Sequence, residues 1–144
     1  MSEVQNTTKI SMTDKVQQVI KIESVEIVDK TSQELSLRVK VYNEAEEEMS
    51  GIIKVYIKDM NSIYAASIPI LYTFETVELG TLEEQTIMIK LYAEAFMIVD
   101  EKGDRYRDSN EFEIYTCIEE GCNQKQSIKK KVQFQSMNEE DFSI

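Results

Sequence analysis

The feature of this sequence that most constrains its fold is the alternation of apolar and polar residues within residues 34–59. Apolar residues occupy every second position, first at Leu35, Leu37, Val39 and Val41 and then, after an acidic connection, at Ile53, Val55 and Ile57. A period of two residues is typical of strands that bury one face, because successive side chains point to opposite sides of a strand. Residues 34–59 therefore predict a hairpin of two half-buried antiparallel strands, and with it an all-β fold.

Further alternating segments, separated by turn residues, extend this pattern over most of the chain. Strands are predicted from residue 20 onward, in the apolar stretch before Gly80, in residues 85–95, and in a final pair at 111–118 and 126–135. Their spacing of roughly 8–12 residues is typical of two packed sheets. The sequence thus predicts an antiparallel β-sandwich of seven to eight strands without a long helix.

Two positions predict irregular strand geometry. The apolar residues of the first strand change face between Ile22 and Val25, which predicts a bulge near Glu23 and Ser24 in a strand that passes from one sheet to the other. Pro69 is the only proline, and because it has no backbone N–H group its strand is expected at a sheet edge.

The length of 144 residues fits one domain, which at this size buries roughly 68–70% of the surface of the unfolded chain. We expect residues 1–19 to form an extended N-terminal arm, residues 20–135 the sandwich, and residues 136–144 an acidic C-terminal tail. The first residues carry no basic and apolar leader, and no run of about 18 apolar residues occurs. We therefore expect no membrane insertion and favour a cytoplasmic location, with an extracellular or virion assembly as the alternative.

Composition restricts the classes of function. The chain has 27 acidic and 16 basic residues, a formal net charge of -11 and no histidine. The negative charge disfavours direct binding of nucleic acid and suits either basic partners or simple solubility. Without histidine the commonest general base and metal ligand is missing, so we expect a protein that is not an enzyme and has no cofactor. We interpret the run Lys129, Lys130 and Lys131 as protection of an edge strand against aggregation.

The two cysteines, Cys117 and Cys122, bracket a short connection between the last two predicted strands. A disulfide across such a hairpin has acceptable geometry and would stabilise the fold by roughly 2 kcal/mol. Two free thiols in a reducing compartment are the main alternative, and a redox or metal-binding pair is a third.

Two acidic segments are candidate partner-binding sites. One lies in the connection within residues 34–59 and the other in the C-terminal tail. Their residues are Glu44, Glu46, Glu47 and Glu48 in the first, and Glu139, Glu140, Asp141 and Phe142 in the second. A third acidic segment, residues 100–110, offers oxygen ligands, but Lys102 and Gly103 break the order of a calcium-binding EF-hand loop. A solvated hairpin or loop is the favoured interpretation there.

Parts of the sequence resemble the immunoglobulin-like and fibronectin-III-like sandwiches of cell-surface and adhesion modules. The resemblance lies in LRVKVYNEAEEEMSGIIKVYIKD and VELGTLEEQTIMIKL, and covers about a third of the chain. The triplet Tyr115-Thr116-Cys117 is similar to the Tyr-x-Cys of an immunoglobulin strand, but alternation places Tyr115 and Cys117 on the outer face. The chain also has no Trp, and its second cysteine follows too closely for an antibody-type core disulfide.

The resemblance implies an immunoglobulin-like fold and a non-enzymatic structural or protein-interaction module. We expect a protein partner or self-association, in which residues 1–19 of one copy add a strand to an open sheet edge of another. The alternative hypothesis is a small acidic inhibitor or nucleic-acid mimic that binds a basic groove on a partner protein.

Overall fold

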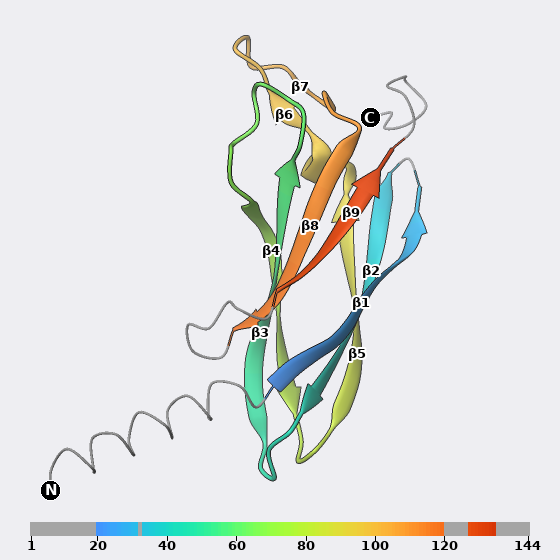
Figure 1. Cartoon of the computed structure of the whole chain (residues 1–144), viewed down its shortest axis with the longest axis vertical. Coiled ribbons are helices and arrows are strands. Elements are labelled where there is room, and N and C mark those ends of the chain that lie inside the picture. Colours follow the sequence, from blue (N-terminus) through green and yellow to red (C-terminus); the bar gives the residue numbers. More distant parts are fainter. Residues whose placement is uncertain (1–19, 32, 120–126, 135–144) are drawn as a thin grey trace, which may run out of the picture.

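The computed structural model describes residues 20–31, 33–119 and 127–134, and these form two antiparallel sheets packed face to face (Figure 1). A three-stranded sheet has the order β1-β2-β5 and a four-stranded sheet the order β4-β3-β8-β9. The strands are β1 (Ile20–Lys30), β2 (Glu34–Asn43), β3 (Met49–Asp59), β4 (Ile70–Leu79), β5 (Glu84–Tyr92), β8 (Glu111–Glu119) and β9 (Ile128–Gln133). A single 3-10 turn, η1 (Ala93–Phe96), and a small hairpin of β6 (Ile98–Val99) and β7 (Arg105–Tyr106) complete the described part. The prediction of an all-β sandwich is confirmed.

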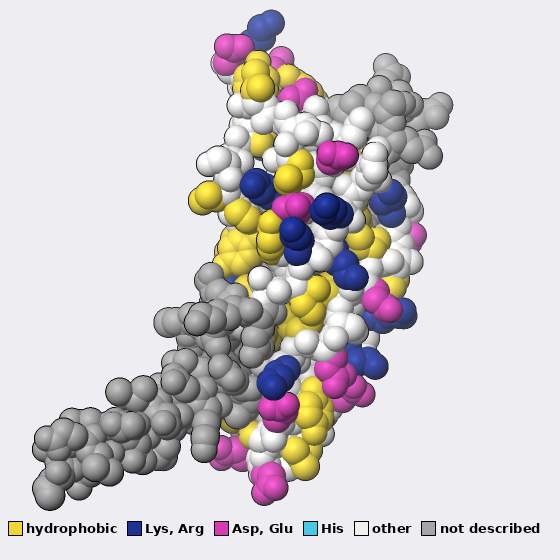
Figure 2. Space-filling view, viewed as in Figure 1, with side chains coloured by type: hydrophobic (Ala, Val, Ile, Leu, Met, Phe, Trp, Pro, Cys, Tyr) yellow, Lys and Arg dark blue, Asp and Glu magenta, His cyan; other side chains and the backbone are white. Residues whose placement is uncertain are grey.

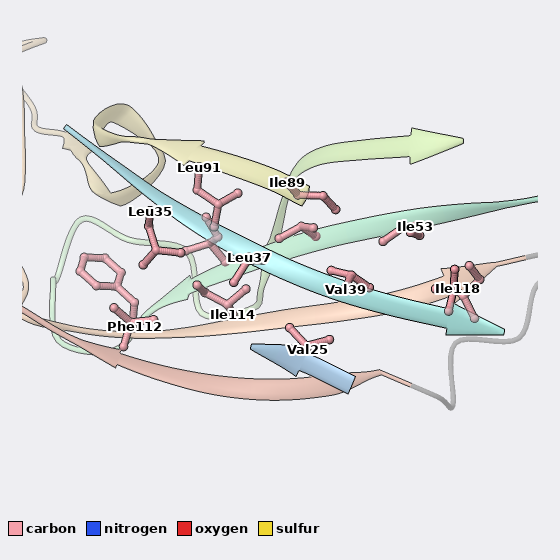
Figure 3. Packing of buried hydrophobic residues seen from close by; sticks show 14 of the residues in the cluster. Val25, Leu35, Leu37, Val39, Ile53, Ile89, Leu91, Phe112, Ile114 and Ile118 are labelled. Carbon is pink, nitrogen blue, oxygen red and sulfur yellow. The ribbon is translucent and has the colours of Figure 1, made fainter. Parts of the chain in front are cut away.

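The core lies between the sheets and is built from the inward-facing residues of both (Figure 3). The alternation in residues 34–59 has the predicted orientation, because the apolar residues of β2 and β3 are buried. Three phenylalanines, Phe96, Phe112 and Phe134, pack edge to face at one end of the core, with ring centroids 5.0 to 5.8 Å apart. Such pairs add about 0.5–1.5 kcal/mol each beyond the area they bury.

The predicted hairpin within residues 34–59 is wrong. β2 pairs with β1 and β5, whereas β3 pairs with β4 and β8, so the chain crosses from one sheet to the other through residues 44–48. It crosses back between β4 and β5 through residues 80–83. Alternation determines which face of a strand is buried but leaves the identity of its neighbour open.

The bulge predicted in the first strand is present, since the pairing of β1 with β2 shifts register between Ile22 and Ser24. The predicted passage of this strand to the other sheet is wrong, because β1 stays paired with β2 along its length. The extra residue at the bulge restores the alternation. As a result Ile22 lies opposite Val41 and Val25 opposite Val39, and all of them face the same core.

Two turn-related predictions are confirmed and one strand end differs. β4 begins directly after Pro69 and is an edge strand, as the missing N–H group requires. The charged segment around Gly103 closes the β6–β7 hairpin, and Gly103 has a positive φ of 89°. The strand predicted for residues 85–95 ends at Tyr92, and η1 begins at the next residue.

No helix within the described residues is long and apolar enough to cross a membrane.

Candidate functional site

The main exposed apolar surface follows β4 and the loop before it. Ile63 is 86% exposed, Ile68 63% and Phe74 56%, although all three are large apolar side chains. We call this surface the β4 patch; its residues are Ile63, Ile68, Ile70, Leu71 and Phe74. Single exposed apolar residues are common on proteins, whereas several of them gathered in one edge strand and the loop before it are typical of an interaction surface.

β4 is also an open edge. It pairs with β3 on one side, and no described strand pairs with its other side. At the opposite edge of the same sheet, β9 carries Lys129, Lys130 and Lys131, which is the usual protection of an exposed edge. The first five residues of β4, ILYTF, carry no charge. The β4 edge therefore offers both main-chain hydrogen-bonding groups and apolar side chains to an added strand.

A cavity of about 290 Å³ adjoins the β4 patch, between the loop that precedes β4 and η1. It is lined by aliphatic and aromatic side chains together with Asp59, Tyr64, Tyr72 and Glu94. Asp59 Oδ1 accepts hydrogen bonds from the backbone N–H groups of Asn61 and Ser62, both at 3.0 Å, and so shapes the start of this loop. Its second oxygen, Oδ2, is buried and accepts no hydrogen bond.

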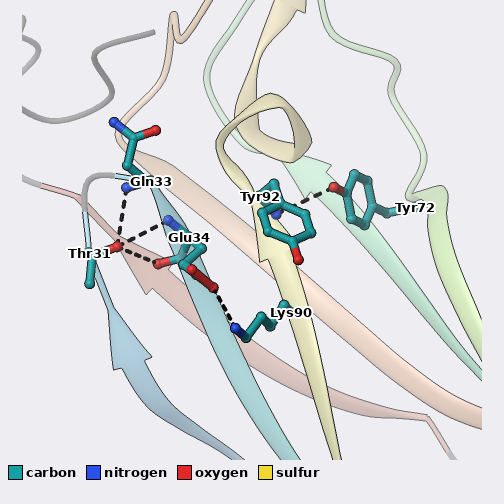
Figure 4. A network of polar contacts seen from close by, with 6 residues as sticks. All are labelled: Thr31, Gln33, Glu34, Tyr72, Lys90 and Tyr92. Carbon is teal, nitrogen blue, oxygen red and sulfur yellow. Dashed lines mark hydrogen bonds and ion pairs between the residues drawn. The ribbon is translucent and has the colours of Figure 1, made fainter.

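Tyr72 lines this cavity and connects β4 to the three-stranded sheet. Its hydroxyl accepts a hydrogen bond from the backbone N–H of Tyr92 at 3.3 Å, which links β4 to the end of β5 (Figure 4). Desolvation by burial raises the pKa of Tyr72, and that hydrogen bond only partly opposes the effect. Nearby, Thr31 Oγ1 accepts hydrogen bonds from the N–H groups of Gln33 and Glu34 and closes the connection between β1 and β2.

The outer face of the four-stranded sheet carries a polar cluster centred on Glu113. The Tyr115 hydroxyl donates a 2.6 Å hydrogen bond to Glu113 Oε1, and Lys129 Nζ lies 3.6 Å from Oε2. The hydrogen bond from Tyr115, with the charge of Lys129 behind it, lowers the pKa of Glu113 although desolvation opposes the shift. The same hydrogen bond raises the pKa of Tyr115. Figure 2 shows dark-blue lysine and arginine side chains gathered around one acidic side chain on this face.

The acidic connection predicted as a partner-binding site is exposed. Glu44, Glu46, Glu47 and Glu48 all lie at the surface in the crossing from β2 to β3. Glu44 is within 3.3 Å of Lys21 Nζ, and both side chains are close to half exposed, so this ion pair contributes little stability.

The remaining predicted site residues are mostly outside the described residues. Cys122 is one of them, so the structure does not test the predicted disulfide; Cys117 is buried on the outer face of β8, as parity predicts. The tail residues Glu139, Glu140, Asp141 and Phe142 also lie outside the described residues.

The acidic segment 100–110 has the form of a hairpin. Asp100 Oδ1 accepts hydrogen bonds from the N–H groups of Lys102 and Asp104, both at 2.9 Å, and so serves the turn itself. Within the part of the chain that the structure describes, no group of acidic or cysteine side chains is arranged to hold a metal ion.

The β4 patch was not among the residues singled out from the sequence. Residues 61–74 carry no charge and include Pro69, the residue that predicted an edge strand. An uncharged apolar run on a predicted edge strand was therefore the available signal.

Neither a protein-family model nor a curated protein sequence matches the chain. Solved structures do match its fold. A β-glucosidase from Listeria innocua, with laminaribiose bound, superposes with a TM-score of 0.67 at 19% identity over 81% of this chain and 16% of that one. A GH3 β-glucosidase from Bifidobacterium adolescentis gives 0.70 at 18% identity over 80% and 17%. A β-glucosidase from Erythrobacter marinus gives 0.69 at 19% over 80% and 15%.

These similarities concern the fold alone, because the identities are low and the chain spans about a sixth of the length of each enzyme. The same arrangement of strands thus occurs as one part of larger proteins. Fold does not determine activity, and function has to be argued from the surface of this chain.

Proposed function

We propose that this chain is a non-enzymatic protein-interaction module of immunoglobulin-like or fibronectin-III-like fold that self-assembles by strand addition. The occupant of the β4 edge is the segment of residues 1–19 from a second copy. The observation that carries the proposal is the open, uncharged edge of β4 with its exposed apolar side chains. The class of fold is supported by seven principal strands in two antiparallel sheets with three crossings between them, from β2 to β3, from β4 to β5 and from β5 to β8.

The composition of residues 1–19 suits this role. The segment contains neither proline nor glycine, which disfavour strands, and it includes Thr7, Thr8 and Ile10, which favour them. Its two acidic and two basic residues cancel. A neutral strand can approach a chain of net charge -11 without the repulsion that an acidic strand would meet.

The assembly can be tested by measuring molar mass with size-exclusion chromatography and light scattering. We expect the full chain to self-associate, and a chain lacking residues 1–19 to be monomeric. Phe74→Lys places a charge on the proposed interface and should also give a monomer. The matched control is Met88→Lys on β5, whose side chain is 52% exposed on an edge strand of the other sheet and should leave assembly unchanged.

Adding residues 1–19 as a separate peptide distinguishes strand addition by this segment from other causes of association. A synthetic peptide of residues 1–19 should bind the truncated chain and fail to bind its Phe74→Lys form, with little change in about 0.5 M salt, because main-chain and apolar contacts are only weakly screened. A full chain that is monomeric, or a truncated chain that keeps the mass of the full chain, would contradict the proposal.

A second candidate function is the acidic inhibitor or nucleic-acid mimic. It is favoured by a hollow of about 560 Å³ beside the connections 44–48 and 80–83. This hollow is lined by Glu48, Glu78 and Glu83. This function predicts binding to a basic protein that weakens steeply with salt. Replacing the three carboxylates by glutamine should abolish that binding and leave self-association intact.

A further inference from the structure

The outer face of the four-stranded sheet is basic and aromatic, although the chain as a whole is acidic. We propose that residues 136–144 of the same chain dock on this face, over β8 and β9. The acidic residues of this segment, Glu139, Glu140 and Asp141, contact lysines of the face, and Phe142 enters an aromatic hollow beside them. Charge, the hollow and the length of the segment each favour this occupant.

Lysines without acidic partners give the face its charge. In one row across β3, β8 and β9, Lys58, Glu113 and Lys131 lie opposite one another, and residues placed in this way share a face. Lys129 pairs with Glu113, whereas neither Lys58 nor Lys131 forms an ion pair with any residue that the structure describes. Figure 2 shows this group of basic side chains.

The other sheet lacks this excess of positive charge. Four basic side chains of the three-stranded sheet each pair with a glutamate. In a chain of net charge -11, the face around Glu113 is therefore the surface that attracts an acidic segment. Residues 136–144 carry three acidic side chains and no basic one.

An aromatic hollow of about 240 Å³ lies beside these lysines. Tyr56 and Tyr115, which lie opposite each other on β3 and β8, line it together with Ile68 and Cys117. Lys129 lies opposite Tyr115 on β9. The hollow is smaller than the roughly 300–1,000 Å³ of most small-ligand sites, so it suits a single side chain. A phenylalanine ring gains from contact with two tyrosine rings.

The segment is long enough to reach both places. It follows soon after Phe134, the last described residue, which comes directly after β9. A turn of two residues after Phe134 brings Glu140 level with Lys131 and then Phe142 level with Lys129. The acidic residues and the aromatic residue thus come in the same order as the lysine row and the hollow.

Two-dimensional NMR tests the docking by comparing the full chain with a chain that ends at Gln135, at a concentration where the full chain is monomeric. We expect the two chains to differ in the amide signals of Lys58, Tyr115 and Lys131. Combining Lys58→Gln with Lys131→Gln in both chains should remove most of these differences. The control is Lys102→Gln in the exposed turn between β6 and β7, which should keep them.

A peptide of residues 136–144, acetylated at its N-terminus, measures the affinity of the face. It should bind the shortened chain, and bind the full chain at least about tenfold more weakly, because the chain's own segment occupies the site. Lys58→Gln with Lys131→Gln should weaken binding to the shortened chain by about tenfold, and so should Phe142→Ala in the peptide. About 0.5 M salt should also weaken binding, since exposed ion pairs are screened.

Four results would overturn the proposal. Identical signals on β3 and β8 in the full and shortened chains would mean that nothing docks there, and equal affinity of the peptide for both chains would mean that the face is open. Equal affinity of a peptide with the same residues in scrambled order would mean general attraction between acidic and basic groups. Signal differences that grow with protein concentration would mean docking between copies.

The proposal is independent of self-assembly through β4, because the comparison is made on monomers. A full chain that is monomeric at every concentration would contradict the proposed function and leave the docking of residues 136–144 standing. The effect of salt also separates the two, since binding of the peptide of residues 1–19 should change little in about 0.5 M salt.

Discussion

Asn43 provides the sharpest test of how the two sheets are held together. Its side chain is fully buried at the end of β2, where the chain leaves for the other sheet. Nδ2 donates to the carbonyl oxygens of Glu47 at 2.9 Å and Gly80 at 2.8 Å, and Oδ1 accepts from the N–H of Ala45 at 2.9 Å. One carboxamide therefore fixes two of the three crossings between the sheets, residues 44–48 and residues 80–83.

The cost of Asn43→Ala follows from these contacts. The substitution removes a partner from the N–H group of Ala45 and from the carbonyls of Glu47, Leu79 and Gly80, and a buried group left unpaired costs about 1–3 kcal/mol. The lower end of this range applies, because the bonds to Glu47 and Gly80 are only partly buried, the bond to Leu79 is long at 3.4 Å, and the Gly80 carbonyl still accepts from the N–H of Glu83. We expect Asn43→Ala to lower the free energy of unfolding by about 3 kcal/mol.

The measurement is equilibrium urea unfolding, with the slope checked against the parent so that only stability is compared. Asn43→Asp keeps the acceptor for Ala45 but turns a charged oxygen toward two carbonyls, so it should destabilise the fold strongly at neutral pH and less once the carboxyl is protonated. Asn61→Ala is the control, because Asn61 is exposed and should cost about 0.5 kcal/mol or less. A loss below about 1 kcal/mol for Asn43→Ala would refute the reasoning.

Three further predictions concern single positions. Gly103→Ala should lower stability by about 1 kcal/mol in thermal unfolding, because φ of 89° is strained for any residue with a Cβ atom. Phe96→Ala should cost about 3–5 kcal/mol in urea unfolding, since it removes a buried ring that packs against both other phenylalanines of the aromatic cluster. Glu113 has a lowered pKa in the folded state, so its carboxylate contributes stability that is present above the unfolded pKa and is lost as pH falls through the folded pKa. Unfolding of Glu113→Gln measured from neutral to acidic pH should therefore show a shallower acid limb.

The parts of the fold that the sequence predicts are those controlled by local geometry. The inward residues of β2 and β3 follow from alternation, and the edge position of β4 follows from Pro69. The turn at Gly103 follows from a residue that tolerates positive φ. Each of these depends on a few neighbouring residues, and each is found in the structure.

Strand pairing could not be predicted in the same way. The stretch that led to the fold prediction contains a crossing where a hairpin was expected, because β2 and β3 satisfy their alternation equally well in one sheet or in two. The residue that distinguishes the two cases is Asn43, since its buried carboxamide has partners in both connections. Those partners are far apart in sequence, so a single sequence gives no sign of them.

The two edges of the four-stranded sheet show why the candidate site lies on β4. An exposed edge invites pairing with other chains, and β9 meets that risk with three consecutive lysines. β4 belongs to the same sheet and faces the same risk, yet its first half is uncharged and the loop before it exposes Ile63 and Ile68. The chain contains 43 charged residues, yet none of them lies in the first half of β4. The unequal treatment of two edges in one sheet is explained if β4 is normally covered by a strand, and this is the state that truncation of residues 1–19 and Phe74→Lys are designed to disrupt.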